Sequence, residues 1–568
     1  MPVLTRSRKI LFGILIFLLL AVIAFQVFID RWLEPVIYKR LQTLIVSGTD
    51  SLYNFKLDNI DVSFWSASVD ITNLHVKVDS LHYAEREQAG TLPAMTAEIN
   101  LSKGVVSDIR LLQLVFNKKI SIGTILSKTA DVTLSRHFRR SNQKITAPNE
   151  PLWKLIEPDI RSIKVDQILL NDINLDYSNA DSATAFKVRF DHCSASIENT
   201  RVDSTVGQDP SRILFSRDIA ILFNNVKLQT SDGLYSVGSK QVRYSSAQRS
   251  LMVDDFRLDP VTTRQAFYKK TGVDRDLFAV YVPKLKCTNF ELPLWIKRNM
   301  ISVDTLSLIG PRVNVYKDRT MPEDKRSKYG RYPHQLLQKA SFILQVKEVK
   351  IKDGLVTYTE KARKTGMEGK LIFQQMAGSI SNISNDDAQM VKNGKCVADL
   401  EGHFMEKSPI HAIFTFHLRD AKNGSFNVAA DMENIHAAEL NPVAIPLALG
   451  EVKSFDIKEL HYNLTGNERR GIGKLRMIYS NLAVELKKVD EDNGKIKNKK
   501  LLSFLVNKFV VYPDNPLKDN ERKAENIQTE RIPDKSFFNL IWKTLYASIR
   551  EITIRIDKLK TDKPEKKK

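Results

Sequence analysis

The chain has 568 residues, of which 43% are hydrophobic and 27% charged, a composition typical of a folded protein rather than a disordered one. Its three cysteines are far apart in the sequence, so neither a disulfide framework nor a thiolate zinc site is indicated. The formal net charge of +20 favours a polyanionic partner, and no nucleic-acid-binding motif accompanies it. We therefore expect the anionic surface of a membrane, and no nucleic acid, as a partner; a basic surface that only aids solubility is the alternative.

An uncharged apolar run of twenty residues occupies positions 10–29, and as a helix it would span about 30 Å, the thickness of the hydrocarbon core of a bilayer. Three basic residues precede it, which places residues 1–9 on the cytoplasmic side. We therefore expect one transmembrane helix, with the rest of the chain outside the cytoplasm. A signal peptide cleaved near Ala24 is the alternative, but the run continues past Ala24 and Trp32 stands where an interfacial anchor would.

After a juxtamembrane linker and helix at residues 30–56, apolar and polar residues alternate, which is the period of a β-strand with one dry face. Long helical patterns are scarce up to residue 512. We therefore predict a mainly β protein whose residues 57–512 form a repetitive domain.

One spacing recurs five times within this domain. Apolar residues stand at offsets +3, +5, +8, +10 and +12 from Val165, Val282, Val303, Val346 and Val452, with a few substitutions. The parity changes between +5 and +8, and a two-residue loop at +6 and +7 would place both groups on one face of a β-hairpin. We therefore predict five hairpins in an elongated, twisted antiparallel sheet, which must curl or pack to bury its apolar face.

The apolar positions of these copies form our candidate functional face. They are Ile168, Leu170, Leu175, Leu306, Leu308, Val313, Val349, Ile351, Val356, Phe455, Ile457 and Tyr462.

The C-terminal part begins with a predicted loop at residues 513–535. Four apolar residues recur every four positions, at Phe537, Ile541, Leu545 and Ile549. This pattern predicts an amphipathic helix within a cap at residues 536–557, with Ser536 as its N-cap, and a basic disordered tail at residues 558–568. The helix either closes the end of the sheet and covers its last strand or contacts a membrane or a protein partner.

Motifs of catalysis are absent from the sequence. No histidine is followed by glutamate, so there is no H-E-x-x-H zinc site, and neither a phosphate-binding loop nor a G-x-S-x-G nucleophile elbow occurs. We expect no enzyme activity, no metal and no cofactor.

Several segments are similar to the AsmA-like envelope proteins of Gram-negative bacteria. They are Asp232–Tyr235, the Val346–Tyr358 copy, Asn441-Pro442, Gly471–Leu486 and Ser536–Leu545. The resemblance implies an inner-membrane anchor that carries a long sheet rolled into a groove with an apolar interior. In that family the groove is thought to let acyl chains of phospholipids cross the envelope, and no catalytic motif is available to carry over.

Two functions remain open at this point. The first is handling of phospholipid or another envelope lipid, for transport between inner and outer membrane or for lipid balance of the outer membrane. The second is a structural or assembly factor for outer-membrane proteins that binds its clients at a sheet edge. Under either, we expect a single-pass inner-membrane protein with its bulk in the periplasm, and the C-terminal helix is a candidate contact for an outer-membrane or envelope protein.

Overall fold

The protein is mainly β: among the residues that the structure describes, 58% lie in strands and 19% in helices. The computed structural model describes residues 34–555 except 36–37, 40, 44, 64, 94, 111–112, 114–116, 137–159, 180–185, 207–208, 210–211, 214, 406 and 490–495. Within that part of the chain, every helix is too short or too polar to cross a membrane. The predicted anchor at residues 10–29, the cytoplasmic residues 1–9 and the tail at residues 558–568 lie outside the described residues.

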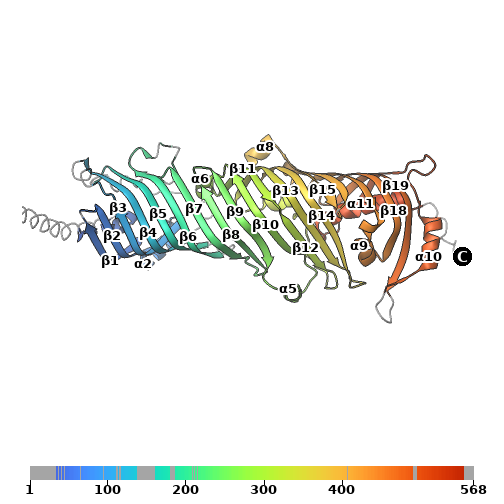
Figure 1. Ribbon diagram of the computed structural model, residues 1–568, viewed down its shortest axis with the longest axis horizontal. Helices are drawn as coiled ribbons and strands as arrows, with labels where there is room; N and C mark the ends of the chain where they lie inside the picture. Colours follow the sequence, from blue (N-terminus) through green and yellow to red (C-terminus); the bar gives the residue numbers. More distant parts are fainter. Residues whose placement is uncertain are drawn as a thin grey trace, which may run out of the picture. The chain divides into compact units, whose positions relative to one another are not determined.

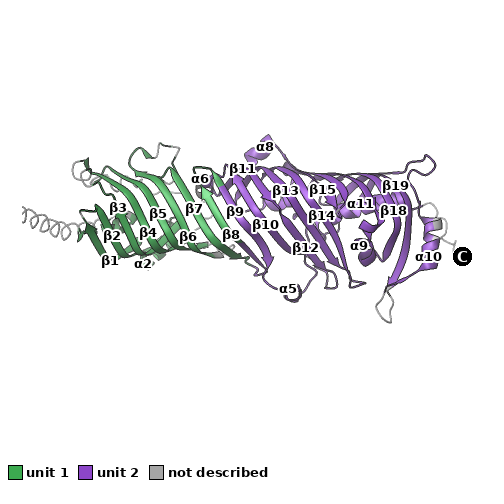
Figure 2. Cartoon of the chain, viewed as in Figure 1, with its two compact units in different colours: residues 1–231, 239–250 green, residues 232–238, 251–568 purple. Residues whose placement is uncertain are grey.

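The chain forms two compact units, which Figure 2 distinguishes by colour. Unit 1 contains residues 1–231 and 239–250, and unit 2 contains residues 232–238 and 251–568. The two strands β8 (Tyr235–Ser245) and β9 (Ser250–Pro260) each include residues assigned to both units.

Unit 1 is a sheet whose strands lie side by side in chain order (Figure 1). Its strands are β1 (Tyr53–Ser63), β2 (Ser68–Val78), β3 (Met95–Ser107), β4 (Lys119–Arg136), β5 (Ser162–Asn179), β6 (Phe186–Val202) and β7 (Asp218–Gln229). Neighbouring strands are antiparallel except β4 and β5, which are parallel. Helix α2 (Ser80–Ala89) follows β2 and is N-capped by Asp79, whose side chain accepts hydrogen bonds from the backbone N–H groups of Leu81 and His82.

Unit 2 contains most of the remaining strands. They are β10 (Leu277–Thr288), β11 (Met300–Ile309), β12 (Arg312–Asp318), β13 (Ile343–Lys361), β14 (Glu368–Ser384), β15 (Lys395–Phe404), β16 (Ser408–His417), β17 (Phe426–His436), β18 (Gly450–Gly466), β19 (Arg470–Val489), β20 (Ile496–Asn498) and β21 (Lys523–Glu530). From β13 to β19 each strand pairs with the next in antiparallel fashion, and β21 pairs with β19. The prediction of a loop at residues 513–535 is therefore wrong over β21.

The sheet is not purely antiparallel in unit 2 either. Strands β11 and β12 both pair with β13 in parallel fashion, and both pair with β10 in antiparallel fashion. The helices of this unit are α5 (Arg264–Thr271), α6 (Leu292–Arg298), α7 (Pro333–Gln338), α8 (Asp387–Lys392), α9 (Ala437–Ala448), α10 (Lys500–Leu505) and α11 (Phe537–Thr553), with a 3-10 turn η3 (Leu418–Asp420) and a π-helical turn η4 (Val506–Val510).

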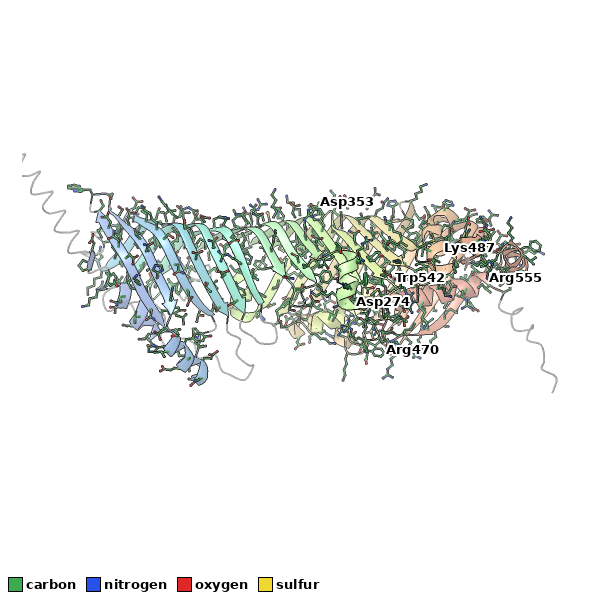
Figure 3. The ribbon with its side chains drawn as sticks, turned by 90° about the horizontal axis from the view of Figure 1, so that it is seen from below. Asp274, Asp353, Arg470, Lys487, Trp542 and Arg555 are labelled. Atoms are coloured by element: carbon green, nitrogen blue, oxygen red, sulfur yellow. The ribbon has the colours of Figure 1, made fainter. Side chains whose placement is uncertain are left out.

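The five predicted hairpins are wrong, because no copy folds back on itself. The copies from Val165 and Val346 lie within the single strands β5 and β13. At offset +7 each has an aspartate in the left-handed region, Asp172 with φ 51° and Asp353 with φ 55°, and Figure 3 labels Asp353 on the exposed surface. The pairing register shifts at both places. A β-bulge adds one residue to a strand and returns the following side chains to the original face, so it produces the same change of parity as a two-residue loop.

The other three copies differ from hairpins in other ways. The copy from Val303 runs through β11 and β12, with Gly310 (φ 65°) between them, and both strands pair with β13 rather than with each other. The copy from Val452 lies within β18, and the copy from Val282 leaves β10 and enters α6.

The largest core of unit 2 lies between β17, β18, β19 and helix α11. Helix α11 packs closely because small residues face each other: a Cβ on Gly473 of β19 would lie 2.7 Å from Thr544 Cγ2 and 3.1 Å from Ser548 Oγ. Leu540 and Ile552, on the same side of the helix, are fully buried. Helix α11 therefore covers part of the sheet in unit 2.

Candidate functional site

Unbroken rows of apolar residues cross the sheet of unit 2. Directly paired residues on neighbouring strands share one face, so the registers define each row. Row A runs through Cys287, Leu306, Val349, Ile380, Ala398, Phe414, Val428, Leu464, Gly473 and Ile527. Row B runs through Leu285, Leu308, Ile351, Gly378, Leu400, Ala412, Ala430, Tyr462, Leu475 and Ala524.

The opposite face of the same strands is polar. The row between A and B contains Lys286, Ser307, Lys350, Ser379, Asp399, Ile413, Ala429, Asn463 and Lys474. Lys350 and Asp399 are exposed to solvent. The two faces therefore differ in character on most of the strands; on β16 and β17 this row holds the apolar residues Ile413 and Ala429.

Unit 1 has apolar rows of its own. One contains only valine and isoleucine, at Val62, Val69, Val106, Ile125, Ile168, Ile197 and Ile219. A second contains Leu57, Leu74, Leu101, Ala130, Ile173 and Cys193. The row beside the second one, on its side away from the first, is polar. There the side chains of His75 and Asn100 lie 2.9 Å apart, and Asn174 donates a hydrogen bond of 3.0 Å to Asp131.

The structure places all twelve predicted residues on strands. Leu306 and Val349 belong to row A, and Leu308, Ile351 and Tyr462 belong to row B. The pairs of Val313 with Val356 and of Val356 with Phe373 form a third apolar row.

The remaining predicted residues divide between the two units. Phe455 and Ile457 belong to the buried core of unit 2. In unit 1, Ile168 lies in the valine–isoleucine row, Leu175 pairs with Val132 and Phe190, and Leu170 pairs with Ser127 and Ala195.

Sequence reasoning missed the strands between the copies, which supply the middle of both rows. Strands β14 to β17 contribute Ile380, Ala398, Phe414 and Val428 to row A. The signal was available as simple alternation, for example at Cys396, Ala398, Leu400 and Phe404 of β15. The five-copy spacing does not contain these strands.

The cover over the apolar face of unit 2 is partial. Helix α9 lies on it, since the Asn441 side chain forms two hydrogen bonds with the backbone of Val452 in β18 and a Cβ on Gly369 of β14 would lie 2.8 Å from Leu447 Cγ. Under α9 and α11, most residues of rows A and B on β17 to β21 are buried. On β11 to β16 several residues of these rows are only half-buried: Leu306, Leu308, Ile351, Ile380, Leu400 and Phe414. The face is therefore closed toward β21 and more open toward β11.

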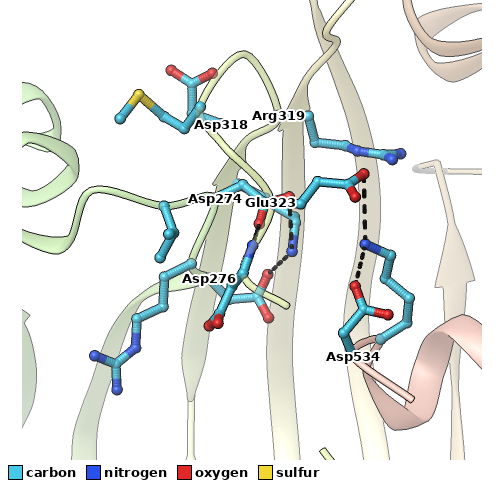
Figure 4. A network of polar contacts seen from close by, with 12 residues as sticks. Asp274, Asp276, Asp318, Arg319, Glu323 and Asp534 are labelled. Carbon is cyan, nitrogen blue, oxygen red and sulfur yellow. Dashed lines mark hydrogen bonds and ion pairs between the residues drawn. The ribbon is translucent and has the colours of Figure 1, made fainter. Parts of the chain in front are cut away.

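A network of polar contacts surrounds the loop between β12 and β13 of unit 2 (Figure 4). Lys317 forms an ion pair of 3.3 Å with Asp276, and the buried carboxylate of Asp274 accepts a hydrogen bond of 2.8 Å from the backbone of Asp324. In the same loop, Glu323 lies 3.8 Å from Lys535, just before α11. These contacts hold the loop against the start of that helix.

A surface hollow of about 650 Å³ lies beside this cluster, lined in part by Lys270, Arg275 and Arg326. Arg326 is already paired with Asp324, and that guanidinium lowers the pKa of the carboxyl to about 2. Lys270 donates to the backbone oxygen of Gly233 at 3.0 Å. Two of the cations that line the hollow, Lys270 and Arg326, therefore have protein partners.

Metal-binding groups are not assembled in the part of the chain that the structure describes. That part has no group of three or more His, Cys, Asp or Glu side chains suited to hold a metal ion. Burial raises the pKa of the thiols of Cys193, Cys287 and Cys396 to about 11, so these cysteines stay protonated at neutral pH and react poorly.

No protein-family model matches the chain, and no curated protein matches it. The resemblance to the AsmA-like proteins therefore remains a prediction from the sequence.

Proposed function

We propose that this protein is a non-enzymatic envelope protein, related to the AsmA-like family, that binds lipid acyl chains along the apolar faces of its sheets. The observation that carries the proposal is the run of rows A and B over ten strands of unit 2 with no charged residue in either. Between β11 and β16 most of these side chains are only half-buried, while Val349, Ala398 and Ala412 are buried. Each methylene of an acyl chain transferred from water to such a surface contributes about 0.8 kcal/mol.

In this proposal the sheets curl into a groove with an apolar interior. The lipid head group stays in water while the acyl chains lie along the rows, and the polar opposite face of the strands keeps the protein soluble. The apolar segment at residues 10–29 anchors the chain in the inner membrane with the bulk in the periplasm, where it moves phospholipid, or another envelope lipid, between inner and outer membrane or balances outer-membrane lipid. Helix α11 caps the groove in unit 2.

The alternative, an assembly factor that binds clients by strand addition, has less support. Strand β21, the last among the described residues, is only eight residues long and carries exposed Lys523, Glu525 and Glu530. Asn526 within it has φ 56°. Short, charged and irregular strands resist edge-to-edge pairing.

Mass spectrometry of lipids that co-purify with the native protein in mild detergent tests the proposal. We expect phospholipid or another envelope lipid well above background. We also expect Ile351→Asp to lose most of that lipid while keeping its circular dichroism spectrum, because a charge in row B lacks a partner.

The matched control is Lys352→Asp, one residue farther along β13 at an exposed position. This variant changes the net charge more, yet should retain the lipid. Absence of lipid from the wild-type protein, or equal lipid in both folded variants, would favour the assembly factor.

A further inference from the structure

A second apolar surface of unit 2 lies on helix α10 and is separate from rows A and B. Leu501 is 75% exposed, Phe504 59% and Leu502 43%. The helix continues directly into the π-helical turn η4. Three large apolar side chains within four residues thus each expose more than two fifths of their surface.

The side of α10 that faces the protein is fixed by hydrogen bonds to strand β19. Ser503 Oγ accepts from the backbone N–H of Leu486 at 2.8 Å. The amide of Asn507 pairs with both backbone groups of Val484, accepting at 2.9 Å and donating at 2.8 Å. Ser503 and Asn507 are four residues apart, so they share one side of the helix. Leu501, two residues before Ser503, consequently points away from the sheet, and Phe504 lies at the flank of the helix with 59% of its surface exposed.

Charge around this surface is strongly positive. Residues 496–512 contain four lysines and no aspartate or glutamate. Lys499 and Lys500, at the start of α10, are exposed. On the adjoining strands, Glu451 and Glu485 form ion pairs with Lys453 and Lys487. Lys487 and Arg555 lie at the same end of unit 2 as α10 (Figures 1 and 3).

We propose that α10 docks onto the surface of an anionic phospholipid bilayer. Leu501, Leu502 and Phe504 enter the boundary between head groups and acyl chains, while Lys499 and Lys500 lie beside the lipid phosphates. Apolar anchors flanked by lysines are the usual composition of interfacial helices, and each lysine near an anionic surface adds to the attraction. A second copy of the chain fits less well, because the same lysines would face each other.

This inference does not depend on acyl-chain binding by rows A and B. It adds a bilayer contact on the C-terminal part of the chain to the anchor expected at residues 10–29. If both hold, the docked helix brings the apolar face of unit 2 to a membrane.

A fluorescent reporter at residue 504 tests the docking. The full chain carries Phe504→Cys labelled with the environment-sensitive dye NBD. It is placed in nanodiscs of phosphatidylcholine, so that the expected anchor at residues 10–29 already has a bilayer and does not insert into added vesicles. The buried native cysteines have pKa values raised to about 11, so labelling is selective. We expect a blue shift and a several-fold rise in emission when vesicles containing phosphatidylglycerol are added, and little change with phosphatidylcholine vesicles.

The matched control reporter is Val391→Cys on α8, because Val391 is 70% exposed and apolar; its emission should not change. Lys499→Gln combined with Lys500→Gln should weaken vesicle binding about tenfold or more while leaving co-purified lipid unchanged, which separates this test from that of the proposed function. A silent reporter at 504, an equal response to neutral vesicles, or a response that rises with protein concentration without vesicles would overturn the proposal, the last in favour of a second copy.

Discussion

Val349→Asp is expected to destabilise the protein by about 4 kcal/mol or more, or to prevent folding. Val349 is 4% exposed and stands in row A between Leu306 and Ile380. Cys287, Val303 and Val346 belong to the same buried cluster, and none offers a cation to pair with a carboxylate. The midpoint of urea denaturation measures the loss.

The neighbouring residue provides the control for this substitution. Lys350 is exposed on the opposite face, and its side chain lies 3.4 Å from Glu348. Lys350→Asp should cost less than about 1 kcal/mol, since exposed ion pairs contribute little. Equal losses for the two variants would show that the two faces of β13 are not distinct.

Phe537→Ala should cost about 3–5 kcal/mol. The ring of Phe537 is 6% exposed, and its centroid lies 4.7 Å from that of Phe426, 5.0 Å from Tyr332 and 5.6 Å from Phe416. Truncation would leave a cavity where the start of α11 meets β16, β17 and the loop before α7. Thermal or urea unfolding measures the effect.

The adjacent ring is the matched control. Phe538 is 65% exposed. Trp542 (52%; labelled in Figure 3) and Tyr546 (54%) lie on the same side of α11 and are also exposed. Phe538→Ala should change stability by less than about 0.5 kcal/mol. A harmless Phe537→Ala would mean that α11 does not close the core and would favour the helix as a contact for a partner.

Much of the fold could be predicted from the sequence because alternation of apolar residues is a local signal. The copies from Val165 and Val452 keep both of their apolar groups on one side, as their buried clusters show. The structure between those groups could not be predicted from the spacing. A bulge at Asp172 and a two-residue loop shift the alternation of apolar residues by the same one position. Only pairing with a distant strand distinguishes them.

Strand β21 illustrates a different limit. Its sequence, Lys523–Glu530, has only two strong apolar positions, Ala524 and Ile527. Its place is set by pairing with residues 470–476 of β19 and by contact with α11. Such contacts are tertiary, and no local pattern reveals them.

The candidate face was incomplete for a related reason. The five-copy spacing identified Val349 and Ile351. Which residues of other strands lie beside them depends on the register in which the strands pair. Residues such as Phe414, in a short strand with ordinary alternation, acquire their role only because Ala398 and Val428 pair with them. Sequence spacing within one strand does not contain that information.

Photo-crosslinking at single positions tests most directly whether the apolar face binds acyl chains. A benzophenone amino acid is placed at Ile351 or Phe414, which are half-buried in rows B and A, and at Lys350 or Asp399, which are exposed on the opposite face. After irradiation of intact membranes, mass spectrometry identifies lipid adducts. We predict adducts at Ile351 and Phe414 and none above background at Lys350 and Asp399; equal yields at all four positions, or adducts at the polar positions alone, would contradict the account.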